Sequence, residues 1–208
     1  MFATAAERDP DFTLAYAHAA WCYTSRKTNG WMENPAQEIA EAERLAKRAV
    51  QLGRDDAAAL CFGGITLGYV VGHVEDGAAF VDRALALNPN LAVAWLASAW
   101  LKLCRGEVEN AISNFNRGIR LSPLDSTRYA WQTDLALAHF FAGRYGEAVR
   151  CAEEAFGSFR KRHPRKPNSP REPLRPSEPS GAEGAYRQPI VSCPCSDVPK
   201  TCYLKSCL

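Results

Sequence analysis

The residue types that most often carry chemistry are present in this sequence, but their spacing matches no catalytic site. Two of the four histidines, His18 and His139, lie in helical patterns among alanine and phenylalanine, without a cysteine, serine or aspartate at a recognisable spacing. The glycine pair Gly63–Gly64 is not followed by the Gly-Lys-Ser/Thr of a phosphate-binding loop. We therefore predict that the protein is not an enzyme and uses no cofactor.

The eight cysteines fall into two sets, and neither predicts a metal site. Structural zinc sites favour ligand pairs separated by about two to four residues. The cysteines near the end of the chain are separated by one, six and four residues, with no histidine nearby: Cys193, Cys195, Cys202 and Cys207. The others lie far apart within helical patterns: Cys22, Cys61, Cys104 and Cys151. That distribution is typical of reduced core cysteines and favours a cytoplasmic location.

Composition and charge limit the class of protein further. The chain has 208 residues, of which 47% are hydrophobic, enough for a sizeable core. Residues 1–157 hold 15 basic and 19 acidic side chains, a net charge of −4, whereas residues 158–208 hold 10 and 4, a net charge of +6. Charged residues interrupt the N-terminal stretch, and four glycines interrupt the longest uncharged run, Ala57 to Val74. We therefore expect neither a secretory signal nor a membrane span.

The stretch 92–125 predicts the elements that position the remaining side chains. Leu96, Trp100 and Leu103 recur at helical spacing, and Gly106 can adopt the left-handed conformation that ends a helix. A second apolar stripe follows and stops before a Ser-Pro pair, because the residue before a proline is pushed out of the helical region. The stretch is therefore predicted to form a helical hairpin.

The same hairpin pattern recurs along the chain. Three pairs of residues lie 34 positions apart: Gly72 and Gly106, Leu87 and Leu121, and Pro89 and Pro123. A period of this length is typical of a repeat solenoid, in which each unit buries its apolar face only against its neighbours.

The residues at these offsets resemble those of the tetratricopeptide repeat. The matching residues are Trp95, Ala111, Phe115 and Pro123. Ser98, Ala99 and Lys102 stand where the family has a Leu-Gly pair and a Tyr, and the two small residues still permit close helix packing. The resemblance implies an all-α fold, a right-handed superhelical solenoid of helical hairpins.

We divide the chain into a repeat array over residues 1–157 and a tail over residues 158–208. The array comprises a partial helix at 1–10 and repeats at about 11–55, 57–91, 92–125 and 126–157. The first repeat carries an insertion after Tyr23 that contains Trp31. We expect Trp31 to fold back over the groove between helices, and the alternative is a loop that contacts a partner.

The tail changes composition abruptly and is predicted to be disordered. Its prolines recur at every third residue: Pro164, Pro167, Pro170, Pro173, Pro176 and Pro179. This period favours polyproline II without a packed core. A ligand for SH3-like domains or a weak nucleic-acid contact is an alternative, but we predict no nucleic-acid partner. We prefer the interpretation that the tail is read in a shifted frame of GC-rich coding DNA.

The repeat resemblance also implies a binding groove, because first helices line the concave surface in that family. The corresponding side chains here are Trp21, Tyr69, Leu96, Trp100, Leu103, Phe140 and Phe141. Such a groove would bind an apolar or aromatic segment of a protein partner. It lacks the Lys and Asn of the variants that clamp a peptide carboxylate.

A narrower resemblance covers about Ala5 to Phe156. The segments GWMENPAQEIAEAERLAKRAVQLGRDDA, DRALALNPNLAVAWLASAW, GEVENAISNFNRGIRLSPLD and ALAHFFAGRYGEA are similar to the repeat region that follows the catalytic domain in class III adenylate cyclases of rhizobia and their relatives. The cyclase domain itself has no counterpart in this sequence. The resemblance implies a regulatory or assembly role without cyclic-nucleotide synthesis.

We therefore predict a non-catalytic protein-interaction module that binds a peptide or partner helix in its groove. The alternative is a detached regulatory fragment of a class III adenylate cyclase, truncated and frameshifted. Since both ends of the array lack a polar capping helix, we also expect self-association through the uncapped repeats.

Overall fold

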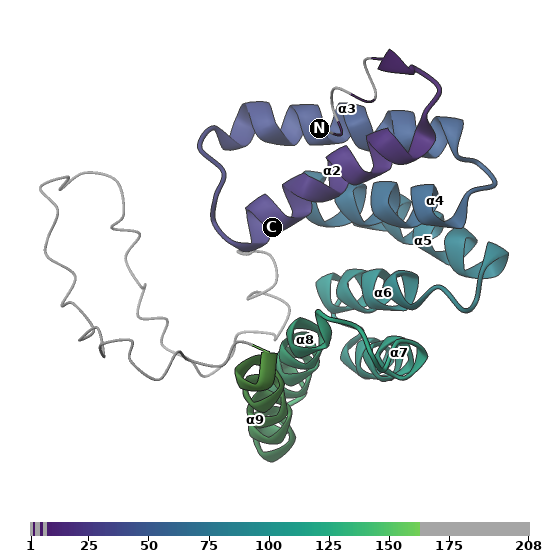
Figure 1. Cartoon of the computed structure of the whole chain (residues 1–208). Coiled ribbons are helices and arrows are strands. Elements are labelled where there is room, and N and C mark those ends of the chain that lie inside the picture. Colours follow the sequence, from purple (N-terminus) through teal and green to yellow (C-terminus); the bar gives the residue numbers. More distant parts are fainter. Residues whose placement is uncertain (1, 3–4, 6–7, 163–208) are drawn as a thin grey trace, which may run out of the picture.

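The computed structural model describes residues 2, 5 and 8–162, and all its regular elements within that part of the chain are helices. The helices are α2 (Thr13–Thr28), α3 (Pro35–Leu52), α4 (Ala57–Ile65), the π-helical segment η1 (Thr66–Val71), α5 (Val74–Leu87), α6 (Ala92–Cys104), α7 (Val108–Leu121), α8 (Arg128–Phe141) and α9 (Tyr145–Arg162). Consecutive helices pair as hairpins, α2 with α3, α4 and η1 with α5, α6 with α7, and α8 with α9 (Figure 1). The hairpins stack in chain order, so the prediction of an all-α helical solenoid is confirmed.

Each hairpin turns at a glycine with positive φ. These glycines are Gly30 (67°), Gly72 (97°), Gly106 (78°) and Gly143 (74°). A side chain at such a position would strain the backbone, whereas glycine adopts it freely. The turn that the sequence predicts at Gly106 is therefore repeated in all four hairpins.

The glycine-rich run between residues 57 and 74 forms α4 and η1. A β-carbon added at Gly77 of α5 would lie 2.5 Å from the carbonyl oxygen of Gly64 and 2.7 Å from the amide nitrogen of Gly68. The glycines thus allow two helix backbones to pack almost in contact. No helix within the described residues has the length and apolarity required to cross a membrane.

The insertion in the first hairpin lengthens α2 and then forms a fixed loop. The guanidinium of Arg26 donates two hydrogen bonds to Glu38, of 2.6 and 3.0 Å, and the backbone amide of Glu33 donates a third, of 2.8 Å. These contacts, chiefly that of Arg26, lower the pKa of Glu38 to about 2. Trp31 is 63% exposed in this loop, so the expectation that it folds back over the groove is wrong.

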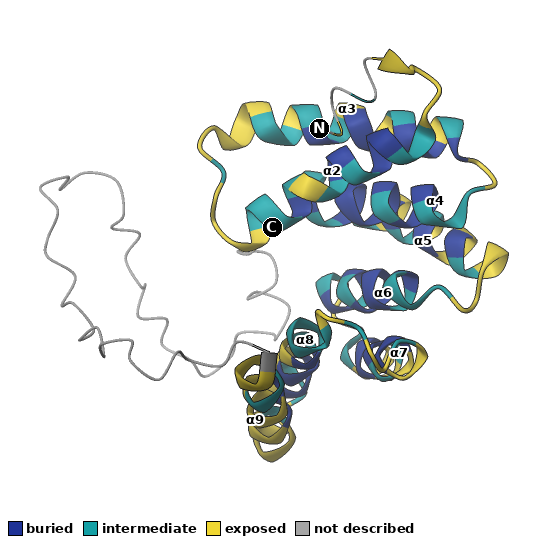
Figure 2. Ribbon diagram, in the orientation of Figure 1, coloured by how far each residue is buried: buried dark blue, intermediate teal, exposed yellow. Residues whose placement is uncertain are grey.

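Two apolar clusters form the core and meet at α6. Ala97 and Leu101 of this helix belong to the cluster of α2–α6, while Leu96 and Leu103 belong to the cluster of α6–α9. Successive α6 residues contribute to both clusters because they point to different sides of the helix. Figure 2 shows the buried residues on the facing surfaces of the helices and the exposed residues on their outer turns.

The cysteines only partly match the expectation of core thiols. Cys61 and Cys151 are buried, Cys104 is half-buried and Cys22 is exposed. Burial raises the pKa of the Cys61 thiol to about 12, which leaves it unreactive. Cys22 lies on the outward side of α2, which the helical pattern alone did not distinguish from the inward side. The tail cysteines and the predicted disordered tail beyond residue 162 lie outside the described residues.

Candidate functional site: an aromatic cleft between four helices

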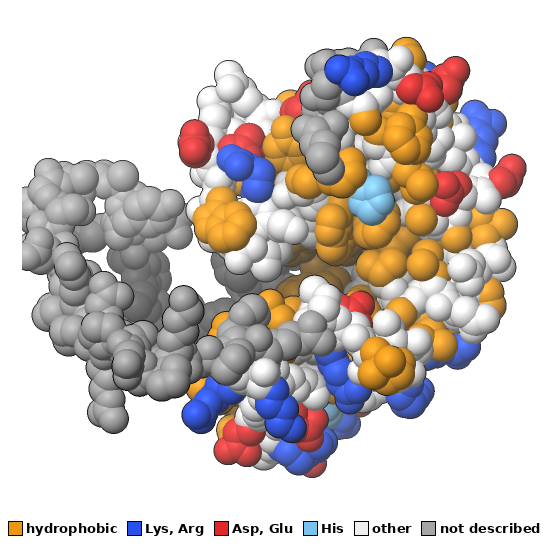
Figure 3. Space-filling view, viewed as in Figure 1, with side chains coloured by type: hydrophobic (Ala, Val, Ile, Leu, Met, Phe, Trp, Pro, Cys, Tyr) orange, Lys and Arg blue, Asp and Glu red, His pale blue; other side chains and the backbone are white. Residues whose placement is uncertain are grey.

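A cleft of about 370 Å³ opens between α2, η1, α6 and α8. Apolar and aromatic side chains form most of its wall, with small polar groups at the rim. The lining residues are Trp21, Thr24, Ser25, Thr28, Asn29, Ile65, Tyr69, Val93, Leu96, Ala97, Trp100, Thr127, Ala130, Trp131 and Asp134. Figure 3 shows apolar side chains around the hollow between the α2–α4 region and the hairpin of α8 and α9.

Ring contacts hold the aromatic side chains of the cleft in place. Trp21 packs on Phe62 with ring centroids 5.3 Å apart, and Tyr69 packs on Trp100 at 5.8 Å. Trp100 also meets Phe115 edge to face at 6.3 Å. Because Phe115 is fully buried, it anchors Trp100 from the core side.

Hydrogen bonds from α2 fix η1, which carries Tyr69. The ammonium of Lys27 donates to the carbonyl oxygens of Tyr69 and Val70, at 2.8 and 3.4 Å, and lies 5.1 Å from the centroid of the Tyr69 ring. The Thr24 and Thr66 hydroxyl groups lie 3.4 Å apart in the buried space beneath. The π-helical turn therefore has side-chain support where it presents Tyr69 to the cleft.

Asp134 of α8 is the charged residue among the described lining residues of the cleft. The indole nitrogen of Trp100 donates a hydrogen bond of 3.1 Å to its Oδ2. Burial raises the pKa of Asp134 from 3.8 to about 6, against the smaller lowering effect of the Trp100 hydrogen bond. At neutral pH the cleft thus contains a carboxylate that burial destabilises.

The structure places the seven predicted groove residues in three surroundings. Trp21, Tyr69, Leu96 and Trp100 line the cleft. Leu103 is fully buried in the core. Phe140 and Phe141 lie at the other end of α8, where Phe140 contacts both Phe141 and Tyr145 at ring-centroid distances of 6.0 and 5.6 Å.

Sequence reasoning missed Trp131 and Asp134. Together with Thr127 they follow the i, i+4, i+7 spacing of one helical face, which is the signal that could have found them. Gly143 lies 37 residues after Gly106, three more than the 34 between Gly72 and Gly106, so the repeat period does not align α8 with the preceding first helices.

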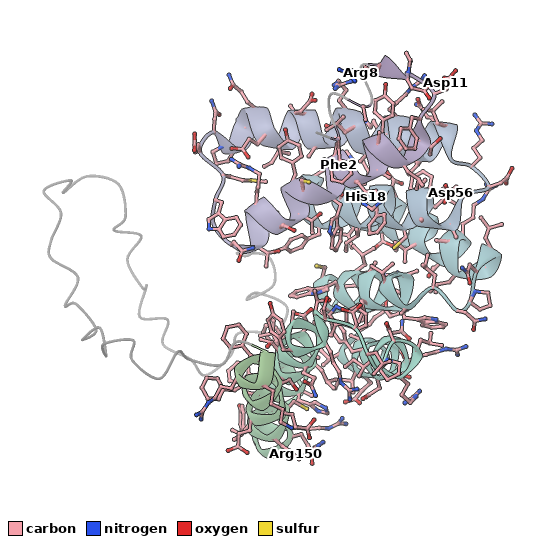
Figure 4. All side chains as sticks on the ribbon, viewed as in Figure 1. Phe2, Arg8, Asp11, His18, Asp56 and Arg150 are labelled. Carbon is pink, nitrogen blue, oxygen red and sulfur yellow. The ribbon has the colours of Figure 1, made fainter. Side chains whose placement is uncertain are left out.

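The histidines lie in packed surroundings. The ring of His18, which belongs to α2, stacks on Phe2 at a centroid distance of 5.2 Å and packs at a tilt against Phe62 at 4.9 Å. Figure 4 shows the labelled Phe2 and His18 next to each other. His139 is buried, and its Nδ1 has no hydrogen-bond partner within the described part of the chain. Burial, assisted by the charge of Arg144, lowers the pKa of His139. Among residues 2, 5 and 8–162, no three His, Cys, Asp or Glu side chains form a group that could hold a metal ion.

Comparison with known proteins identifies the architecture. No protein-family model matches the sequence, and no curated protein matches it either. Among solved structures, that of MamA superimposes with a TM-score of 0.54 at 19% identity, covering 78% of this chain and 86% of the other. That of PilW, a type IV pilus biogenesis factor, superimposes with a TM-score of 0.56 at 21% identity, covering 78% of this chain and 67% of the other.

This chain has the tetratricopeptide-repeat fold. At such low identity the similarity concerns the path of the helices. The tetratricopeptide-repeat resemblance read from Trp95, Phe115 and Pro123 therefore agrees with the structure, whereas the narrower resemblance to the repeat region of adenylate cyclases is not addressed by these neighbours.

Proposed function

We propose that the protein is a non-catalytic interaction module whose aromatic cleft binds an anchor side chain of a protein partner. The observation that carries this proposal is the set of four rings, Trp21, Tyr69, Trp100 and Trp131, that lines one open cleft. Large aromatic side chains provide contact area at a low cost in side-chain entropy and dominate the energetics of many interfaces. Because these rings are partly exposed to solvent, they are more typical of a binding surface than of a closed hydrophobic core.

The volume of the cleft limits the size of the ligand that it can bind. A volume of about 370 Å³ lies near the lower end of ligand-binding pockets and suits one or two side chains. A partner segment would therefore lie along the concave surface and insert an anchor residue. The polar rim of Thr28, Asn29 and Thr127 offers hydrogen-bond partners for the backbone of that segment.

Two matched tryptophan variants test this proposal. Peptides selected from a phage library on the full-length protein should bind Trp131→Ala about tenfold or more weakly than wild type, because Trp131 lines the cleft. Trp31→Ala is the control, since Trp31 is exposed in a loop outside the cleft lining. Dissociation constants would be measured by fluorescence anisotropy after circular dichroism has shown that both variants are folded. Equal affinity for Trp131→Ala and wild type would place binding elsewhere and refute the proposal.

A cytoplasmic location and independence from cofactors belong to this proposal. They are supported by the buried thiols of Cys61 and Cys151 and by the apolar packing around His18 and His139. The second candidate, a regulatory segment of a class III adenylate cyclase, rests on the four sequence segments quoted above. This candidate function predicts that fusing the chain to such a catalytic domain changes the cyclase activity. An unchanged activity would refute it.

A further inference from the structure

We propose that the cleft recognises a basic side chain, a lysine or arginine of the protein partner, which enters among the aromatic rings and pairs with Asp134. This inference rests on the proposed function and adds the chemistry of the anchor residue. It commits the cleft to a partner segment with a positive charge.

The position of Asp134 supports a positively charged ligand. Its carboxylate lines the cleft, and within the described residues it forms no ion pair, its hydrogen-bond donor being the neutral indole of Trp100. A carboxylate taken from water without a cation is costly to keep ionised. An asparagine could accept the same Trp100 hydrogen bond without that cost. The carboxylate is therefore better explained by a cation that arrives with the ligand.

The rings around Asp134 provide the second half of the site. Tyr69 and Trp100 pack at a centroid distance of 5.8 Å, and both line the cleft together with Trp21 and Trp131. A cation within about 6 Å of such a ring centroid is attracted by its negative face, and the attraction strengthens when the site excludes water. The Lys27 ammonium already lies 5.1 Å from the centroid of the Tyr69 ring. The rings left for the cation of a ligand are therefore those of the three tryptophans.

The charge pattern of the cleft excludes the opposite ligand. The described lining residues other than Asp134 are uncharged, so no lysine or arginine of the wall compensates an acidic side chain. A glutamate or aspartate placed there would face Asp134 in a medium of low dielectric and be repelled. A neutral apolar anchor would leave the carboxylate with the Trp100 hydrogen bond but without a cation to balance its charge.

Three labelled peptide pools test the inference. They differ in one central residue, Lys, Gln or Glu, and carry the same uncharged mixture at the flanking positions. Full-length wild-type protein should bind the Lys pool about tenfold more tightly than the Gln pool and show no measurable binding of the Glu pool. Asp134→Asn should lower the affinity for the Lys pool to that for the Gln pool. Asp82→Asn, which makes the same charge change on the exposed outer side of α5, should behave as wild type.

The outcomes separate this inference from the proposed function. If the Lys and Gln pools bind equally, or if Asp134→Asn keeps the preference, the cation site is refuted while the binding cleft stands. If no pool binds, and the phage-selected peptides bind Trp131→Ala as tightly as wild type, both proposals are refuted. Arg165 and Lys166 belong to the basic tail, residues 158–208. If the double variant Arg165→Gln/Lys166→Gln binds the Lys pool more tightly than wild type does, this tail competes for the cleft and the proposal of a partner's basic side chain is refuted.

Discussion

At the scale of single residues, Asp134 carries a stability cost that can be measured. Its pKa in the folded protein, about 6, lies above its ordinary value of 3.8, so between these values the folded state holds a proton that the unfolded state releases. The free energy of unfolding therefore falls as the pH rises through this window, and the full cost is present above about pH 6.

Asp134→Asn should remove that cost. At neutral pH we expect the variant to be more stable than wild type by about 1–3 kcal/mol, and the difference should vanish below about pH 4. Urea denaturation at both pH values measures it, with Asp82→Asn as the control. A stability difference that is the same at both pH values would contradict the assignment of the shifted pKa. If Asp134→Asn is more stable than wild type but binds basic peptides more weakly, Asp134 contributes to binding at a cost in stability.

His139 is buried in a different way, as a core residue. Its depressed pKa follows from burial and from the charge of Arg144, and its orphan Nδ1 lies inside the last hairpin, away from the cleft lining. Alanine and phenylalanine surround this residue in the sequence, a pattern that fits either a core or a groove histidine, and the structure buries it.

At the scale of helices, the close packing of α4 and η1 on α5 depends on glycine. Gly77→Ala would place its new β-carbon against the backbone of Gly64 and Gly68, which cannot rotate away as a side chain would. We expect a loss of about 3 kcal/mol in the free energy of unfolding, measured by urea denaturation.

Gly146→Ala is the matched control for that variant. No atom lies within 4 Å of a β-carbon added there, and the residue is in α9, so alanine should be neutral or stabilise by about 0.5 kcal/mol. A similar loss for both variants would show that the loss at Gly77 does not come from its close backbone contacts, because helix propensity favours alanine over glycine at either position.

The helices were predictable from the sequence to a greater extent than the cleft. Gly72 and Gly106 mark the hairpin turns in the sequence, because a left-handed turn requires glycine whatever the rest of the fold. Each turn can therefore be predicted from the residues next to it. The cleft depends on how the last hairpin sits against α6, which no local pattern encodes. Leu103 was therefore assigned to the groove although it points into the core, and Asp134 was overlooked because its partner Trp100 is on another helix.

At the scale of the whole molecule, the last helix leaves an apolar face uncovered by the described residues. Tyr145, Val149 and Phe156 of α9 are 63%, 58% and 62% exposed and follow the spacing of one helical face. In a repeat array the next hairpin would cover this face. We therefore expect the protein to self-associate through α9.

A single glutamate on that face should reverse the association. Sedimentation velocity of wild type at rising concentration should show a growing sedimentation coefficient, and Val149→Glu should sediment as a monomer. Leu124→Glu is the control, because Leu124 is 92% exposed in the loop before α8. A wild-type monomer at every concentration would disprove the expectation.

The position of the tryptophans has a practical consequence. Three of the five in the sequence, Trp21, Trp100 and Trp131, line the same cleft. The indole N–H of Trp100 donates a hydrogen bond to the carboxylate of Asp134, whose pKa is about 6. The ultraviolet emission of these tryptophans should therefore change both when the carboxylate gains a proton and when a ligand displaces water from the rings. The molecule contains its own optical reporter, and occupancy of the cleft can be followed without attaching a dye.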